Sequence, residues 1–176
     1  MITIPAVVWD IVFYAFCTII LIQIFYYLFF FRRLAFYKAP QKNTSVEYAV
    51  SVIVCARDEA HQLSTNLPGI LVQDYKSTHE IVVVNDNSID DTKYLLDEFK
   101  KSFKNINHIL LSQEAKLITG KKFPLSIGVK SAKHEILILT DADCIPASEN
   151  WILKMQAAFK DGIQIVLGYG AYKRKK

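Results

Sequence analysis

The fold predicted from this sequence depends most on one stretch, Glu135-Ile-Leu-Ile-Leu-Thr-Asp-Ala-Asp-Cys144. Its four apolar residues, 136–139, form the short run that is typical of a buried β-strand, and the run ends at Thr140. Asp141 and Asp143 follow directly, and in an extended backbone residues two apart point to the same side. Two neighbouring carboxylates repel each other unless a positive group lies between them. A magnesium-type cation, with phosphate oxygens as its other ligands, would fill that position.

A solvent-exposed turn is the alternative for the same two aspartates, because aspartate is common in turns. The rest of the chain favours a ligand site. Two more strands, 49–55 and 80–84, also end in acidic residues, namely Asp58 with Glu59, and Asp86. In an open sheet of parallel strands, ligands bind beyond the carboxyl ends of the strands. Acids from three strand ends at one edge therefore predict a site for a metal and a nucleotide.

Strands and helices alternate along the second part of the chain, which predicts βαβ units and a mostly parallel sheet, and therefore an α/β fold. The expected strands are 49–55, 80–84, 107–111 and 135–140, with a candidate fifth strand over 163–167. The expected helices are 60–72 with a kink or a break at Pro68-Gly69, 93–103 capped within Asp90-Asp91-Thr92, 122–132, and 148–159 capped by Ser148.

Length and composition set broad limits. The 176 residues suit one globular domain, and the net charge of +4 is modest. Of the residues, 52% are hydrophobic, and most of the excess over an ordinary globular protein lies near the N-terminus. No basic stripe with interleaved aromatic residues occurs, so nucleic acid is not an expected partner. Cys17, Cys55 and Cys144 lack metal or disulfide spacing and are expected to be reduced.

The N-terminal segment is predicted to be a membrane anchor. Residues 6–31 are apolar except for Asp10, Thr18 and Gln23, with aromatic residues near both ends. As a helix the segment would be roughly 39 Å long, enough to cross a hydrocarbon core of about 30 Å with some tilt. A signal peptide would need a basic start and a cleavage site, and a buried core helix is rarely so apolar all round.

Basic residues follow this segment and none precedes it; they are Arg32, Arg33, Lys38 and Lys42. The positive-inside rule then places the following chain in the cytoplasm. We therefore expect this part of the protein to cross the cell (inner or plasma) membrane once, with a cytoplasmic globular part. The expected domains are an anchor over 1–33, a juxtamembrane linker over 34–47 and a globular region over 48–176 that carries the expected metal and nucleotide site.

The sequence contains no glycine-rich phosphate loop. Gly120-Lys121 is not part of a P-loop, because Ala115 and Lys122 stand where glycine and a hydroxyl residue are needed. Gly168-Tyr-Gly170 begins like a dinucleotide fingerprint, but Lys173 occupies the third glycine position. A diphosphate would therefore need a metal and a Lys or Arg, for which Lys121 is the candidate. An ordinary surface lysine is the alternative interpretation.

Five stretches occur in an order and spacing that resemble family 2 glycosyltransferases of the GT-A fold. They are 50–59, 66–68 with 73–75, 80–90, Gly120-Lys121 with Gly128, and Asp141-Ala-Asp143. The resemblance covers about residues 48–170 and is nearest to membrane-bound polysaccharide synthases and glycolipid-forming enzymes. It implies a nucleotide-diphosphate sugar as donor (usually a UDP-sugar), a polysaccharide or lipid acceptor, transfer with inversion, and Mg²⁺ or Mn²⁺ as the cofactor.

The resemblance also implies roles for individual residues. Those expected to bind the nucleotide sugar are Ala56, Arg57, Glu59, Asp86, Lys121 and Asp141, and those expected to bind the metal are Asp141 and Asp143. Asp86 would contact the base, and Lys121 would lie near the diphosphate. Asp141 would reach the ribose or the metal.

Some positions depart from the family pattern. Asn85 replaces an aspartate, Asp58 stands where asparagine is commoner, and Pro124 and Ser126 replace alanine and asparagine. These changes blur the choice of nucleotide but remove no metal ligand. The catalytic base and a Gln-x-x-Arg-Trp-type acceptor motif lie well beyond the metal motif in the family, so both are expected beyond Lys176. The chain is therefore predicted to be the donor-binding half of a longer enzyme.

Two other functions fit parts of the sequence. A catalytically silent, membrane-tethered nucleotide-binding module would explain the missing base. A nucleotidyltransferase also uses acids on an α/β sheet, but it would need a basic, glycine-rich loop after the first strand. Residues 56–59, Ala-Arg-Asp-Glu, are acidic instead.

Overall fold

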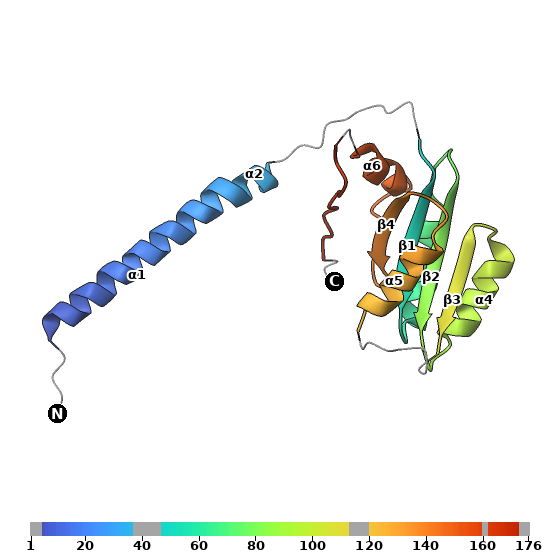
Figure 1. Ribbon diagram of the computed structural model, residues 1–176, viewed down its shortest axis with the longest axis horizontal. Helices are drawn as coiled ribbons and strands as arrows, with labels where there is room; N and C mark the ends of the chain where they lie inside the picture. The colour runs from blue at the N-terminus through green and yellow to red at the C-terminus, as the bar shows by residue number, and fades with distance from the viewer. Residues whose placement is uncertain (1–4, 37–46, 113–119, 160–161, 173–176) are drawn as a thin grey trace. The chain divides into compact units, whose positions relative to one another are not determined.

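A computed structural model describes residues 5–36, 47–112, 120–159 and 162–172 (Figure 1). The chain divides into two compact units, residues 1–42 and residues 43–176, and each is described by itself. Most of the predicted linker, with Lys38 and Lys42, lies outside the described residues, and so do Ala115 and Lys173.

The first unit is one helical rod. Helix α1 (Ala6–Tyr26) continues into the π-helical turn η1 (Tyr27–Phe31) and the short helix α2 (Arg32–Ala35). The stretch Val7–Phe31 is long and apolar enough to cross a membrane, judged by length and composition, and its side chains are exposed in the structure. The Thr18 hydroxyl donates a hydrogen bond of 2.8 Å to the Tyr14 carbonyl, so this polar group is satisfied within the helix.

The second unit is built on a sheet of four parallel strands in the order β3-β2-β1-β4 (Figure 1). The strands are β1 (Val50–Ala56), β2 (His79–Asp86), β3 (Ile106–Leu111) and β4 (Ile136–Asp141). β1 and β2 are nearly continuous runs of buried valine and isoleucine, as expected for strands that are covered on both faces.

Four helices flank this sheet: α3 (Ala60–Leu71), α4 (Thr92–Ser102), α5 (Lys122–Ser131) and α6 (Trp151–Ala157). Val52 and Val54 of β1 share a buried cluster with Leu63 of α3 and Leu96 of α4. Ile53, which points to the other face, meets α5, which lies across β1 and β2 (Figure 1). Helices therefore cover both faces, and the predicted α/β fold is confirmed.

Three details of the prediction are wrong. Helix α3 is not split at Pro68, which was one of the two expected alternatives; it continues to Leu71, and the Val72 N–H bonds the Pro68 carbonyl at 3.0 Å. Helix α6 begins at Trp151, three residues after the predicted cap at Ser148. Residues 163–167 form no strand, because no strand of the described chain pairs with them to satisfy their backbone.

Candidate active site

The strands of a parallel sheet end at the same side, and we call that side the carboxyl edge. It comprises Arg57–Glu59 after β1, Asp86 at the end of β2, and Asp141–Asp143 at the end of β4. The pairing register aligns Cys55 with Asp141 on one side of β1, and Ala56 with Asn85 on the other. The acids predicted from three separate strands therefore lie along one edge. β1 is also where the strand order reverses, the place where open α/β sheets bind ligands.

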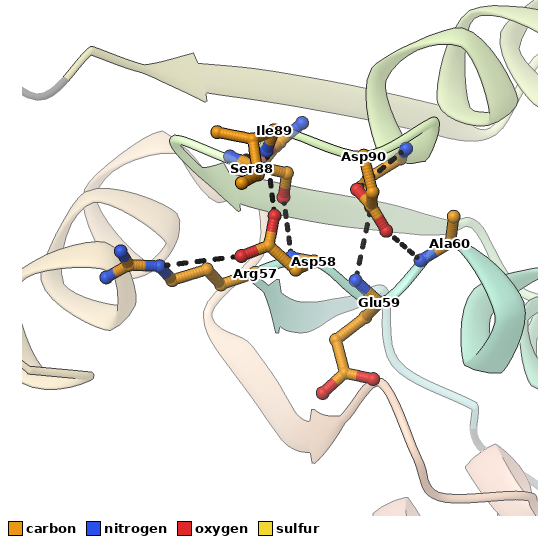
Figure 2. A network of polar contacts seen from close by, with 9 residues as sticks. Arg57, Asp58, Glu59, Ala60, Ser88, Ile89 and Asp90 are labelled. Atoms are coloured by element: carbon orange, nitrogen blue, oxygen red, sulfur yellow. Dashed lines mark hydrogen bonds and ion pairs between the residues drawn. The ribbon is translucent and has the colours of Figure 1, made fainter.

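The loop after β1 is fastened to the loop after β2. Asp58 adopts a left-handed backbone conformation with φ of 54°, which aspartate tolerates better than most residues. Its N–H donates to the Ser88 hydroxyl at 2.9 Å, and its Oδ1 accepts the Ile89 N–H at 2.7 Å (Figure 2). The Asp58 carboxylate thus holds the two loops together. Arg57 is exposed, with its Nε 3.9 Å from Asp58 Oδ2, a weak surface pair.

Asp90 strengthens the same connection. Its Oδ2 accepts the Ala60 N–H of α3 at 3.0 Å (Figure 2). Its Oδ1 accepts the Thr92 N–H of α4 at 3.1 Å and the Thr92 hydroxyl at 2.5 Å. One carboxylate therefore caps two helices. Burial would raise the pKa of Asp90, but the hydrogen bonds from Thr92 and Ala60 outweigh it and lower that pKa.

The backbone of Glu59 takes part in this hydrogen-bond network, but its side chain does not. Its N–H donates to the Thr92 hydroxyl at 3.2 Å, while its carboxylate points away from the network (Figure 2). Ala56 is buried, so only its backbone can face a ligand. The sequence interpretation missed Asp58, Ser88 and Asp90 as residues that hold these loops; the only signal was the cap expected at Asp90-Asp91-Thr92.

At the end of β2, Asp86 is buried, with only 7% of its surface exposed. Asn85, which departs from the family pattern, accepts the Ser88 N–H with its Oδ1 at 3.0 Å. Its side chain therefore shapes the turn that follows Asp86. Asn87 in that turn has φ of 54°, a conformation that asparagine adopts more readily than most residues.

The backbone does not stay extended from Asp141 to Asp143, so the condition under which both side chains would point to the same side is not met. β4 ends at Asp141, and the chain turns, with the Cys144 N–H donating to the Asp141 carbonyl at 3.1 Å. Ala142, between the two acids, is buried in the core, whereas Asp141 and Asp143 are exposed. Burial of the methyl group therefore turns the chain here and leaves both carboxylates facing solvent.

Lys121, at the start of α5, forms an ion pair with Oδ1 of Asp141. It lies at the carboxyl edge, next to the acid expected to bind the nucleotide sugar. Cys55 is close to this pair: burial raises the pKa of its thiol, and the positive charge of Lys121 partly opposes that change. An amine, two carboxylates and a half-buried thiol thus occupy the edge between β1 and β4.

The acids of this edge suit a metal whose shell is completed by a ligand. Within the described residues, no three His, Cys, Asp or Glu side chains are grouped closely enough to hold a metal ion by themselves. Asp141 and Asp143 are exposed hard oxygen donors, and Mg²⁺ is usually bound by one or two carboxylates together with substrate phosphates. The donor set therefore fits Mg²⁺ or Mn²⁺ bound jointly with a diphosphate.

Sequence comparison finds curated relatives that are sugar-polymer synthases and glycosyltransferases by name. Poly-beta-1,6-N-acetyl-D-glucosamine synthase of Staphylococcus epidermidis is 28% identical over 124 residues, which are 68% of this chain and 28% of the synthase. Glycosyltransferase AglE of Haloferax volcanii is 31% identical over 110 residues, 62% of this chain and 34% of AglE. The chain thus spans about a third or less of the length of these relatives.

Among solved structures, the chain resembles a mannosyltransferase of Pyrobaculum calidifontis in complex with GDP-Man and Mn²⁺. The TM-score is 0.59 at 25% sequence identity, over 75% of this chain and 39% of the mannosyltransferase. The predicted GT-A fold is confirmed by this likeness and by the parallel sheet with helices on both faces. Residues 51–175 match the family model described as glycosyl transferase family 2, and the chain belongs to that family.

Proposed function

We propose that this chain is the donor-binding region of a membrane-anchored glycosyltransferase. It binds a nucleotide-diphosphate sugar, with a UDP-sugar as first candidate, whose sugar is transferred to a polysaccharide or lipid acceptor. The observation that carries the proposal is the convergence of Glu59, Asp86, Asp141 and Asp143 along one sheet edge, beside Lys121. The names of the relatives support sugar transfer, and the mannosyltransferase complex holds a nucleotide sugar with Mn²⁺.

Each residue has a distinct proposed task. Asp86 contacts the base, and the backbone of Ala56 lines the nucleoside site together with the side chains of Arg57 and Glu59. Asp141 and Asp143 hold Mg²⁺ or Mn²⁺, which when bound neutralises charge that develops on the leaving diphosphate. Lys121 adds a second positive charge beside the diphosphate, and it must exchange its contact with Asp141 for one with a phosphate oxygen.

The proposed domain organisation follows the same reasoning. Residues 1–33 form the membrane anchor, 34–47 the linker, and 48–176 the donor-binding region in the cytoplasm. The apolar helix over Val7–Phe31, followed by Arg32 and Arg33, supports the anchor and its orientation.

Removal of one metal ligand tests the proposal. In the full chain, solubilised in detergent, we expect UDP or GDP to bind more tightly with MnCl₂ than without it. Asp143→Ala should abolish that gain, because one of the two carboxylates that hold the metal is lost. Isothermal titration calorimetry measures both affinities.

Glu98→Ala is the matched control. It removes the same charge from the exposed middle of α4 and should leave the metal-dependent gain intact. Equal affinities for wild type and Asp143→Ala, in the presence of Mn²⁺, would contradict the proposed site. Hydrolysis or transfer of the sugar from a bound donor would further separate a transferase from a silent binding module.

A further inference from the structure

A buried amide of α3 contacts the centre of the acidic turn. Nδ2 of Asn66 donates a hydrogen bond of 2.9 Å to the carbonyl oxygen of Ala142, the residue between Asp141 and Asp143. Only 6% of the Asn66 surface is exposed, and the two residues lie 76 positions apart in the sequence. A buried carbonyl needs a donor, and within the described chain Asn66 is the side chain that supplies it.

This hydrogen bond acts on the peptide unit that links Ala142 to Asp143. The orientation of that peptide fixes the backbone angle that leads into Asp143, and hence the direction in which the Asp143 side chain leaves the chain. The bond between the Cys144 N–H and the Asp141 carbonyl closes the turn, but it leaves the Ala142 carbonyl to be held from outside.

The donor itself is held in a rigid place. Leu63, Leu67 and Ile70, on the same helix as Asn66, are at most 1% exposed and pack in the core. Asn66 therefore cannot follow the turn if the turn moves, so the turn is held in one arrangement before any ligand binds. In a metal site, residues that contact the metal ligands, but not the metal, hold those ligands in the orientation that binding requires.

We propose that Asn66 is a positioning residue for the metal-binding pair: by holding the Ala142 carbonyl, it sets the direction of the Asp143 carboxylate. The inference rests on the proposed function. It assigns a task to the Asn66-Leu-Pro68 stretch, which the sequence resemblance singled out and left without a role.

The test compares metal-dependent and metal-independent binding in the detergent-solubilised full chain. For Asn66→Ala we expect the Mn²⁺-dependent gain in affinity for UDP or GDP to fall about tenfold or more, as is typical when a residue behind a metal ligand is lost. Affinity for the nucleotide without metal should stay within about twofold, because no nucleotide contact is removed. Calorimetry gives the affinities, and electron paramagnetic resonance of Mn²⁺ reports the bound metal directly.

Ser51→Ala is the matched control. The Ser51 hydroxyl is also buried, donates to Glu80 Oε1 at 2.8 Å and accepts the His134 N–H at 3.1 Å, but it lies at the amino end of β1. Its removal, like that of Asn66, is expected to lower the melting temperature, but it should leave the gain from Mn²⁺ unchanged. Asn66→Ser, whose hydroxyl is too short to reach the Ala142 carbonyl, is measured in parallel and replaces Asn66→Ala if that variant does not fold.

The outcomes separate the two proposals. If wild type shows the gain from Mn²⁺ and the Asn66 variants keep it in full, or Ser51→Ala loses as much, the positioning role is overturned and the proposed function stands. Misfolding of both Asn66 variants would also overturn it, since Asn66 would then serve folding alone. If wild type itself shows no gain from Mn²⁺, the proposed function fails, and this inference fails with it.

Discussion

At the scale of single residues, two positions that depart from the family pattern form hydrogen bonds with the backbone of the loop after β2. Asp58 bonds the loop after β2, and Asn85 bonds the turn that follows its own strand. Their side chains are used within the protein, so the departures alone do not identify the nucleotide. Asp90 goes further, because it joins the first turns of two helices.

The removal of Asp90 should therefore destabilise the protein more than the loss of one ordinary cap. Asp90→Ala leaves the Ala60 and Thr92 N–H groups without their acceptor, and we expect the free energy of unfolding to fall by about 2 kcal/mol or more, given ~1 kcal/mol for a typical cap. Urea denaturation followed by circular dichroism measures it. Asp91→Ala, the adjacent exposed residue with no side-chain cap bond, should change it little; equal losses in the two variants would refute the double cap.

Glu80 makes stability depend on pH. Burial raises the pKa of its carboxyl. Hydrogen bonds from the Lys133 N–H and the Ser51 hydroxyl, together with the charge of the Lys133 ammonium, lower that pKa by more, so the net shift is downward. A lowered pKa in the folded state adds stability above the unfolded-state pKa, and that stability is lost as the pH falls through the folded-state value.

We therefore expect the free energy of unfolding to decrease as the pH falls below about 5, because an unfolded glutamate has a pKa of about 4.3 and that of folded Glu80 is lower. Glu80→Gln should flatten that decrease, with denaturation by urea at each pH as the measurement. Glu98→Gln, an exposed glutamate in α4, serves as the control. If the free energy of unfolding decreased equally steeply with falling pH in wild type and in Glu80→Gln, Glu80 would not be the source of the pH dependence.

At the scale of elements, α5 approaches the sheet through a glycine. A Cβ added at Gly128 would lie 2.6 Å from Cγ2 of Ile53 and 3.1 Å from Cγ2 of Val84, closer than atoms pack. Gly128→Ala should therefore destabilise the protein by about 1–3 kcal/mol, the usual cost of overpacking. Thermal and urea unfolding measure the change.

Gly69 of α3 provides the contrasting substitution. Its added Cβ would meet only Cδ of Pro146, at an ordinary 3.6 Å. Gly69→Ala should therefore stabilise the protein by up to ~1 kcal/mol, since alanine is the better helix former. Stabilisation by Gly128→Ala as well would show that α5 can move away from the sheet without cost.

The order and type of the elements could be predicted from the sequence because each buried strand is a short apolar run, whereas in the helices apolar residues recur at helical spacing. The start of α6 could not. Oε1 of Gln73 accepts the Trp151 and Ile152 N–H groups at 2.9 and 3.2 Å, so the cap comes from a distant residue and not from Ser148. Such a contact leaves no local pattern.

The site, like the fold, could be predicted only in part. That acids of three strands share an edge follows from the parallel sheet, and this was expected. The turn at Asp141-Ala142-Asp143 was not, because it depends on burial of Ala142 and on the bond from Asn66. The mostly apolar run over 163–167 resembles a strand, but a strand also needs a neighbour, and the sequence of one segment does not reveal whether it has one.

At the scale of the whole molecule, the proposed orientation can be tested with a thiol. Cys144 is exposed at the carboxyl edge, Cys55 is half-buried, and Cys17 lies within the apolar helix. A membrane-impermeant maleimide should label Cys144 in inside-out vesicles and not in intact cells, because the region after the anchor is proposed to be cytoplasmic. Mass shift on gels measures labelling, and Cys144→Ser should remove it. Labelling in intact cells would reverse the proposed topology.

The central position of β1 has a consequence for how the chain acquires its structure. β1 leaves the ribosome before either of its partners, and Val50 finally pairs with Ile136, which is made much later. At a synthesis rate of about 5–20 residues per second, β4 is made several seconds after β1. During that time, the side of β1 that will pair with β4 stays exposed to solvent. Closure of so long a loop is slow, so we expect nascent chains that stall before β4 to be substrates for chaperones.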